Sequence, residues 1–396
     1  MKKLSLDSEV FTRAVEDIVT RGELKKLLSR NRVLRIKHGI DASGPELHIG
    51  HAVSLWKLRA LQEAGHKAVI LLGDVTTQIG DPTGKLKTRP MLPKITIKKN
   101  IAAVKNQLEK ILHTNPRVYE LHYSSEWYNK MRAPEFLKLL SHITHARLIE
   151  RDMFQGRLRK KTEIYMSELI YPVLQGYDSV ILRSDLTIVG SDQLFNEHLG
   201  RMFQEKFGQP PQVIVALKIL PGVGGGEKMS KSLGNYIGLS DSPQDKFGKA
   251  MRLLDSLIVP YLEVYTDVPP NKIRGIEHAL RGGQNPMAAK LFFAEALVRR
   301  YHGNKVAQKE RDRFLKIFSK KEFQKAAPLV TIKIGRWELT ELLLRLGFAA
   351  SKSDARRLIA QGAVEIDGKR ITVPSEINIK HGSTIRAGKR RLARVE

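Results

Sequence analysis

The sequence of 396 residues predicts an α/β fold built on a doubly wound parallel sheet. In residues 32–61 and 186–201, an apolar strand runs into a glycine-containing turn and then into a helical period. Two further apolar runs, 68–74 and 212–220, are typical of strands buried in a parallel sheet. Strand, helix and strand in this order imply right-handed crossovers. Ligands of such sheets bind beyond the carboxyl ends of the strands.

Composition narrows the possible functions. Sixty-eight Lys and Arg against 41 Asp and Glu give a formal charge of +27, which favours a polyanionic partner, most simply nucleic acid. There is no cysteine, so disulfides, thiolate chemistry and cysteine metal sites are excluded. No apolar run follows the opening MKK or is long enough to span a membrane, and we expect a cytoplasmic protein. Its length allows two or three domains.

The first strand-to-helix turn, IDASGPELHIGH at residues 40–51, is a candidate nucleotide site. A helix start presents unpaired backbone N–H groups and partial positive charge, which suit a phosphate. His48 and His51 fall on one face of the opening turn, and Gly50 leaves room for a flat base. A capped helix with surface histidines, or a histidine metal pair, would explain the same pattern.

Polar residues in three later segments are further candidates for a binding site. Asp81 lies in the turn IGDPTGK, although an Asp before Pro is also an ordinary turn former. Within residues 167–182, Tyr171, Gln175 and Asp178 form one polar stripe on an otherwise apolar helix. Buried polar groups need partners, and a bound polar ligand is one, whereas a solvated helix face is the alternative. Asp192, after the strand of residues 186–190, is placed to accept hydrogen bonds from a ribose.

A glycine-rich loop, PGVGGGEKMSKSLGN at residues 221–235, follows the last apolar run. It presents Lys228 and Lys231 together with Ser230 and Ser232. Two lysines on a loop that can close suit a polyphosphate whose charge changes during a reaction.

The rest of the chain reads as helices and a small basic module. Residues 1–30 carry an amphipathic helical pattern, and helices are expected at 244–254, 271–280, 286–301 and 307–317. From residue 336 the pattern gives two short helices, a strand and a turn at Asp367 and Gly368. Residues 333–396 hold fourteen Lys or Arg against seven Asp or Glu, which fits contact with phosphates, although a merely soluble tail is the alternative.

Taken together, HIGH at residues 48–51 and KMSKS at 228–232 resemble the paired signatures of class I aminoacyl-tRNA synthetases. The further segments GIDAS, IGDPTGK, YPVLQGYD and GSDQLFN resemble the tyrosyl-tRNA synthetase family, in the bacterial branch whose loop reads KMSKS. The resemblance covers essentially the whole chain, and residues after 335 resemble the small RNA-binding domain named after ribosomal protein S4.

The resemblance implies a tyrosine-tRNA ligase that joins L-tyrosine to ATP and then to tRNA(Tyr), with Mg²⁺ accompanying ATP and no tightly bound metal. It implies a Rossmann-like catalytic domain (1–238) with a dimer-forming insertion near 120–165, a helical anticodon-side domain (239–325), a linker (326–334) and an RNA-binding domain (335–396). A homodimer is expected.

The resemblance also assigns residues. The catalytic set is His48, His51, Lys228, Lys231 and Ser43, and the ATP-binding set adds Asp41, Gly50, Gly190, Asp192 and Ser230. Asp81, Tyr171 and Gln175 would hold the tyrosine ammonium, Asp178 its phenolic hydroxyl, and Gln193 would lie near its carboxylate. The expected tRNA contacts are Lys352, Arg356, Arg357, Lys389, Arg390 and Arg391.

Two other functions stay open at this point: a non-catalytic RNA-binding protein descended from such an enzyme, and a related synthetase for another aromatic amino acid. One departure concerns specificity. Lys37 stands where other branches place a tyrosine that bonds the substrate hydroxyl, so the second partner of that hydroxyl is undefined.

Overall fold

The computed structural model describes the chain except residues 1–3, 31, 84–91, 231–232, 319–327 and 389–390. The chain divides into two compact units, Met1–Asn304 and Lys305–Glu396. The expected division into three domains and a linker stays a prediction. Among the described residues, no helix is long and apolar enough to cross a membrane.

A doubly wound sheet forms the centre of the first unit, as predicted, and it has six strands. Its strands are β1 (Val15–Val19), β2 (Arg35–Ile40), β3 (Lys67–Leu72), β4 (Tyr119–Tyr123), β5 (Leu186–Gly190) and β6 (Val213–Leu217). Their order is β1-β6-β5-β2-β3-β4, and every neighbouring pair except β1 and β6 is parallel. Because β2 lies between β5 and β3, the chain winds outward from the middle of the sheet in both directions.

The helical expectation for residues 1–30 is wrong in its central part. Two helices, α1 (Glu9–Thr12) and α2 (Arg21–Ser29), flank β1, which pairs antiparallel with β6 at one edge of the sheet. Ala14 has a φ of 54°, which breaks the helical path just before β1. Thr20 then caps α2 in a capping box with Glu23, so a new helix starts directly after the strand.

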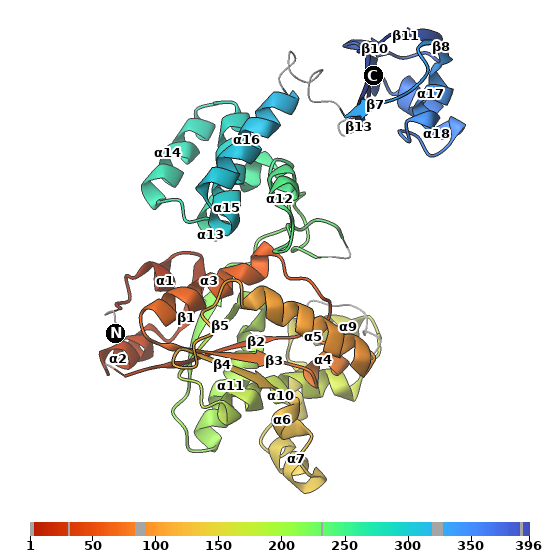
Figure 1. Ribbon diagram of the computed structural model, residues 1–396. Coiled ribbons are helices and arrows are strands. Elements are labelled where there is room, and N and C mark those ends of the chain that lie inside the picture. Colours follow the sequence, from red (N-terminus) through yellow and green to blue (C-terminus); the bar gives the residue numbers. More distant parts are fainter. Residues whose placement is uncertain (1–3, 31, 84–91, 231–232, 319–327, 389–390) are drawn as a thin grey trace. The chain divides into compact units, whose positions relative to one another are not determined.

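Helices cover both faces of this sheet. α3 (Ile49–Glu63) and α5 (Lys94–Leu108) lie on one face, and α10 (Met166–Ile181) and α11 (Leu194–Lys206) lie on the other (Figure 1). The apolar side of α10 packs with Leu199 and Phe203 of α11 in one buried cluster. This packing holds α10 helical although Pro172 lies within it, and it fixes the direction of its polar stripe.

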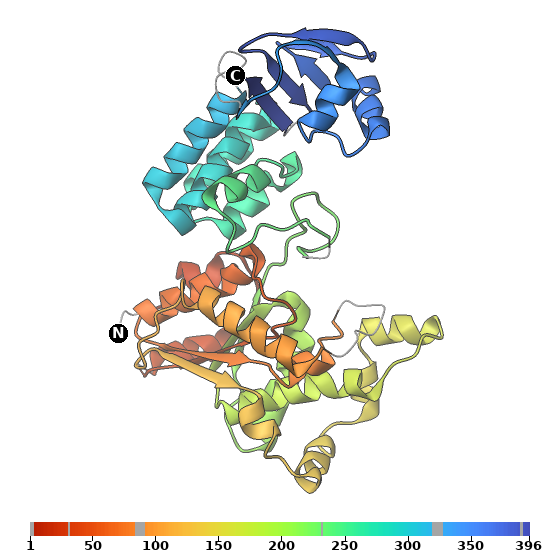
Figure 2. The ribbon, with the colours of Figure 1, turned by 45° about the vertical axis from the view of Figure 1, so that its right-hand side comes forward.

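Residues 109–165 depart from the sheet after adding β4 to its edge. The short helices α6 (Ser125–Tyr128), α7 (Ala133–Leu140), α8 (His145–Ile149) and α9 (Asp152–Arg159) follow, and both views show α7 projecting from the body of the unit (Figures 1 and 2). Thr76–Ile79 forms the short helix α4 just after β3.

The predicted helices beyond residue 240 are confirmed within a few residues. They are α12 (Pro243–Ala250), α14 (Pro270–Arg281), α15 (Pro286–His302) and α16 (Asn304–Phe318). A further helix, α13 (Ile258–Tyr265), was not predicted. Five of its eight residues are buried, so its sequence carries little polar periodicity to reveal a helix.

The second unit contains the predicted small α+β module. It comprises α17 (Leu339–Arg345), α18 (Lys352–Ala360) and the strands β7 (Leu329–Val330), β8 (Gly335–Glu338), β9 (Val364–Ile366), β10 (Lys369–Ile371), β11 (Glu376–Ile379), β12 (Thr384–Ala387) and β13 (Arg391–Val395). The predicted turn joins β9 to β10, with φ of 50° at Asp367 and 80° at Gly368. Leucines of α17 and valine and isoleucine side chains of the strands form one buried core.

Candidate active site

One open cavity of about 370 Å³ lies at the carboxyl ends of the central strands. This is where a doubly wound sheet is expected to bind its ligand. It brings together thirteen of the predicted residues: Asp41, Ser43, His48, Gly50, His51, Asp81, Tyr171, Gln175, Asp178, Gly190, Asp192, Gln193 and Lys228. Ser230 does not line it, and Lys231 falls outside the described residues.

The histidine turn is ordered by its own side chains. His48 is the residue before α3, and its backbone N–H donates to Nδ1 of His51 at 3.2 Å, while the two ring centroids lie 3.8 Å apart. Gly50 faces the His48 ring so closely that an added Cβ would meet Nδ1 at 2.8 Å. The missing side chain of Gly50 therefore makes room for a histidine ring as well as opening the turn toward the cavity.

The lysine loop reaches the same cavity. Nζ of Lys228 lies 2.7 Å from Oδ2 of Asp192, in the turn that follows β5. The backbone after this loop is tied to the histidine turn, because the N–H of Ile49 donates to the carbonyl of Ile237 at 2.9 Å. The histidine turn is thus joined by backbone hydrogen bonding to the segment just after the lysine loop, about 190 positions later in the sequence.

One end of the cavity holds the carboxylates of Asp41 and Asp81. The side chain of Gln193 donates to Oδ2 of Asp81 at 2.8 Å. Asp41 accepts from Thr76 at 2.7 Å and from the hydroxyl of Tyr171 at 2.9 Å. Desolvation raises the pKa of Asp41 to about 6. The Tyr171 hydroxyl, expected at the substrate ammonium, is therefore already bonded to a carboxylate of the turn after β2.

The other end holds Asp178, whose neighbours the sequence did not reveal. Its Oδ1 lies 2.8 Å from the hydroxyl of Tyr128 and accepts from Nε1 of Trp127 at 3.0 Å, both from α6. Burial raises the pKa of Asp178 to about 7, against the opposing effects of Lys37 and these two donors. No local pattern links residues about fifty positions apart, although SSEWY does offer two aromatic donors in a row.

Lys37 lines the cavity, and its ammonium group is already paired with other side chains. Its Nζ forms a fully buried ion pair with Oε2 of Glu197 at 2.9 Å and donates to Oγ of Ser179 at 2.7 Å. Glu197 is a second residue of the site that sequence reasoning missed. The sequence offered one signal, because Glu197, on α11, follows the GSDQ segment by four residues. A charged side chain on the buried face of a helix requires a partner.

The predicted RNA-contacting residues lie apart from this cavity in sequence and belong to the second unit. Lys352, Arg356 and Arg357 are exposed on α18, where Arg357 pairs with Asp354 at 2.6 Å. The guanidinium of Arg391 donates to the carbonyl of Phe348 and so helps to hold the module together. Lys389 and Arg390 fall outside the described residues.

Comparisons with known proteins agree with this architecture. Residues 29–319 match the family model described as tRNA synthetases class I (W and Y), and residues 339–377 match the S4 domain. The tyrosine–tRNA ligase of Moorella thermoacetica is 41% identical over 392 residues, covering 98% of this chain and 94% of that protein. The tyrosine–tRNA ligase of Thermotoga maritima is 40% identical over 389 residues, covering 98% and 96%.

Solved structures share the fold. The tyrosyl-tRNA synthetase of Archaeoglobus fulgidus, complexed with L-tyrosine, has a TM-score of 0.59 at 22% identity and covers 77% of this chain and 98% of that one. A C-terminally truncated mitochondrial tyrosyl-tRNA synthetase from Coccidioides posadasii has a TM-score of 0.59 at 25% identity, covering 76% and 88%.

The parallel sheet, with the histidine turn and the lysine loop at one cavity, defines a class I aminoacyl-tRNA synthetase. Within this class, tyrosine–tRNA ligases are about 40% identical to this chain over nearly its full length. The chain therefore belongs to the tyrosine–tRNA ligase family. The predicted family and fold class are therefore confirmed.

Proposed function

We propose that this protein activates L-tyrosine with ATP, releasing pyrophosphate, and transfers the tyrosyl group from the adenylate to the terminal adenosine of tRNA(Tyr). The observation that carries the proposal is the single cavity lined by His48, Lys228 and Asp178, since it combines both signature segments with a buried acceptor for a phenol. Membership of the ligase family supports the same reaction.

Tyrosine would lie along the floor of the cavity, with its hydroxyl at Asp178 and its ammonium toward Asp81 and Gln175. A phenol is a hydrogen-bond donor, and Asp178 is a buried carboxylate whose other contacts all come from one side of the group, at Oδ1. Phenylalanine would leave this buried acceptor without its partner, which is the physical basis for selecting the hydroxyl.

ATP would lie over the histidine turn. Gly50 gives access to the adenine, and Gly190 and Asp192 border the ribose, while Lys228 and His48 face the phosphates. The tyrosine carboxylate attacks the α-phosphate in line, so no protein nucleophile is required. Catalysis then consists of positioning and of neutralising the charge that develops on the pyrophosphate.

Mg²⁺ is expected to arrive with ATP. Among the described residues there is no group of three or more His, Cys, Asp or Glu side chains that could hold a metal by itself. Mg²⁺ is typically held by substrate phosphates and water with one or two protein carboxylates. When bound, the ion would offset negative charge on the phosphates.

The S4 domain supports RNA binding by the second unit, and we assign the tRNA contacts to the exposed basic side chains of α18. A homodimer is part of the proposal. Leu137 on the projecting helix α7 is 64% exposed, and Leu158 and Met166 in the same region are 45% and 69% exposed, which is the apolar surface that a subunit contact would cover. Light scattering of the intact protein should give the mass of two chains.

The decisive experiment is exchange of labelled pyrophosphate into ATP in the presence of single amino acids. Exchange that depends on tyrosine supports the proposal. Exchange with tryptophan alone would assign another substrate, and no exchange with any amino acid would leave only an RNA-binding role.

A further inference from the structure

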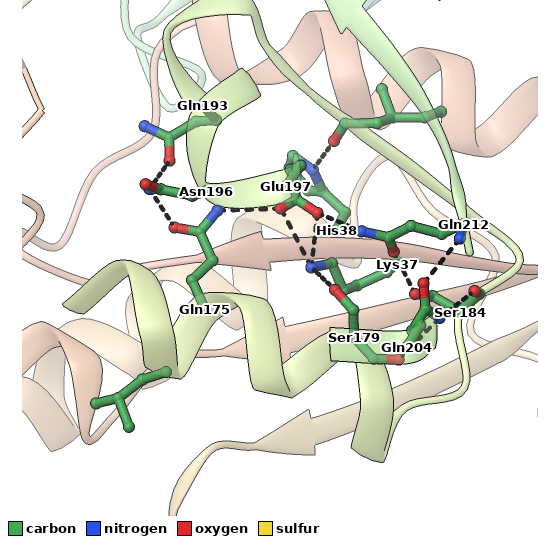
Figure 3. A network of polar contacts seen from close by, with 12 residues as sticks. Lys37, His38, Gln175, Ser179, Ser184, Gln193, Asn196, Glu197, Gln204 and Gln212 are labelled. Carbon is green, nitrogen blue, oxygen red and sulfur yellow. Dashed lines mark hydrogen bonds and ion pairs between the residues drawn. The ribbon is translucent and has the colours of Figure 1, made fainter. Parts of the chain in front are cut away.

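A chain of hydrogen-bonded polar side chains lies beside the cavity, and its members come from different parts of the sequence. Lys37, Glu197 and Asn196 are buried, and Figure 3 shows the chain from Lys37 to Gln193. In order its members are Lys37, Glu197, Gln175, Asn196, Gln193 and Asp81. Each contact between neighbours is between 2.8 and 3.1 Å. The chain joins the end of the cavity near Asp178 to the end assigned to the substrate ammonium.

Glu197 is the centre of this chain. Its Oε1 accepts from Nε2 of Gln175 at 3.0 Å and from Lys37 at 3.1 Å, and its Oε2 accepts from Lys37 at 2.9 Å and from Nε2 of Gln212 at 2.8 Å. Each of these four contacts comes from a donor. Because a carboxylate has about four acceptor positions, Glu197 is fully used.

Lys37 is also fully used. An ammonium has three N–H donors, and the buried Nζ has three acceptors within 3.1 Å: Oγ of Ser179 and the two oxygens of Glu197. Lys37 therefore compensates Glu197 and has no donor left for a substrate hydroxyl. Lys37 is therefore not the second partner of that hydroxyl.

The orientation of each amide in the chain follows from its two ends. Glu197 and Asp81 only accept, so Gln175 and Gln193 must turn their NH₂ groups toward them. Both carbonyl oxygens then face Asn196, whose Nδ2 donates to Gln175 at 2.8 Å and to Gln193 at 3.0 Å. A reversed Gln175 would set its NH₂ against the NH₂ of Asn196 and its carbonyl against a carboxylate.

We propose that Glu197 is a positioning residue for tyrosine binding: it fixes the amide of Gln175 so that the carbonyl oxygen, with one lone pair left after Asn196, is presented to the substrate ammonium. The inference deepens the proposed function and depends on it. Asn196 transmits the same constraint to Gln193 and Asp81. Neither residue needs to touch the substrate.

Glu197→Gln is the test, because it keeps the shape of the side chain and replaces one acceptor with a donor. Whichever way the new amide turns, its NH₂ meets another donor, from Gln175 or from Gln212. The matched control is Glu205→Gln, the same substitution on an exposed position of α11.

Calorimetric titration with two analogues separates positioning from general stability. Tyramine keeps the ammonium and lacks the carboxylate, whereas 3-(4-hydroxyphenyl)propionate keeps the carboxylate and lacks the ammonium. In Glu197→Gln we expect the Kd of tyramine to rise about ten- to hundredfold, the effect of one charge-assisted hydrogen bond, and the Kd of the propionate to stay within about twofold. Glu205→Gln should change neither.

Equal weakening of both analogues would show that Glu197 only supports the fold, and no weakening of either would also overturn the inference. If Glu197→Gln does not fold because Lys37 is left unpaired, the double variant Lys37→Met with Glu197→Leu removes both charges together. Loss of Lys37 also acts on Asp178, which binds the phenol that both analogues share, so the expected result is a ten- to hundredfold rise in the Kd of tyramine relative to the Kd of the propionate, about the effect of one charge-assisted hydrogen bond. The proposed function is tested separately, by tyrosine-dependent pyrophosphate exchange in the unchanged protein.

Discussion

Asp178 has a proton affinity suited to regulation of binding near neutral pH. Burial is the main cause that raises the pKa of Asp178 to about 7. The charge of Lys37 and the donors Tyr128 and Trp127 lower this pKa, and the nearby Asp41 raises it further. The ionised carboxylate is the stronger acceptor for a phenol. As pH rises through about 7, Asp178 loses its proton, so the affinity for tyrosine should increase rather than decrease.

Tyr128→Phe tests this assignment. The substitution removes the hydroxyl that lies 2.8 Å from Oδ1 of Asp178 and 2.7 Å from the carbonyl oxygen of Leu174, and it leaves the ring. The ionised carboxylate therefore loses one stabilising contact. The pKa of Asp178 should rise by about one unit, because a hydrogen bond of about 1 kcal/mol corresponds to roughly that shift. The measurement is kcat/KM for tyrosine in pyrophosphate exchange against pH, which reports groups of the free enzyme.

In the Tyr128→Phe variant the midpoint of that profile should move to higher pH, with the same plateau on the alkaline side. A profile that keeps its midpoint would assign the titration to another group. A loss of activity at every pH would indicate that Tyr128 positions α6 instead of tuning Asp178.

The residues of the site that the sequence did not reveal share one property. Tyr128, Trp127 and Glu197 act through contacts with side chains 22 to 160 positions away, so no local period or spacing contains them. His48, His51 and Gly50, in contrast, act within one turn of helix. Their arrangement is local, which is why it was predictable.

At the scale of elements, prediction succeeded where a segment is buried on a defined face. The apolar runs of β2, β3, β5 and β6 lie in the interior of the sheet, and α10 shows a clear polar stripe. The edge strands β1 and β4 were missed. Both strands are partly exposed, and β1 contains Glu and Asp while β4 contains Glu and His. Their sequences therefore do not differ from those of amphipathic helices or loops.

The start of α3 gives a prediction that belongs to one element. Gly50 is its second residue, and an added Cβ would lie 2.8 and 2.9 Å from atoms of the His48 ring. Gly50→Ala should displace this ring from the nucleotide site and lower kcat/KM for ATP by about tenfold or more, the loss of one good polar contact. Stability should stay the same or rise by up to about 1 kcal/mol, since alanine favours helix.

Gly22→Ala is the matched control, because Gly22 is also the second residue of a helix, α2, and an added Cβ there meets nothing within 4 Å. It should share any gain in thermal stability and leave kinetics unchanged. If Gly50→Ala binds ATP normally, the ring of His48 does not contribute to nucleotide binding from its present position.

At the scale of the whole molecule, the positive charge is spread over both units, whereas the core of the small module belongs to the second unit alone. Residues 305–396, the second unit, hold 22 Lys or Arg against 10 Asp or Glu, a net +12 of the total +27, which leaves +15 on residues 1–304. The basic surface is therefore not confined to the second unit, and RNA affinity should be shared along the chain. The core of the small module, by contrast, is formed only by residues of the second unit, so it contributes no buried side chain to the cavity.

Ending the chain at residue 328 should therefore separate the two steps of the reaction. This truncation removes β7 through β13 as a set, leaving no strand of that module without its partner. Tyrosine-dependent pyrophosphate exchange should stay within about twofold, because the amino acid and ATP need only the first unit. Charging of tRNA(Tyr) should fall by at least about tenfold, the loss of roughly 1.4 kcal/mol of binding from removed phosphate contacts.

Raising the salt concentration should weaken charging less in the shortened chain than in the full one, because fewer counterions are released on binding. Normal charging by the shortened chain would mean that the second unit is not needed to hold tRNA, and a parallel loss of exchange would mean that it supports the catalytic unit.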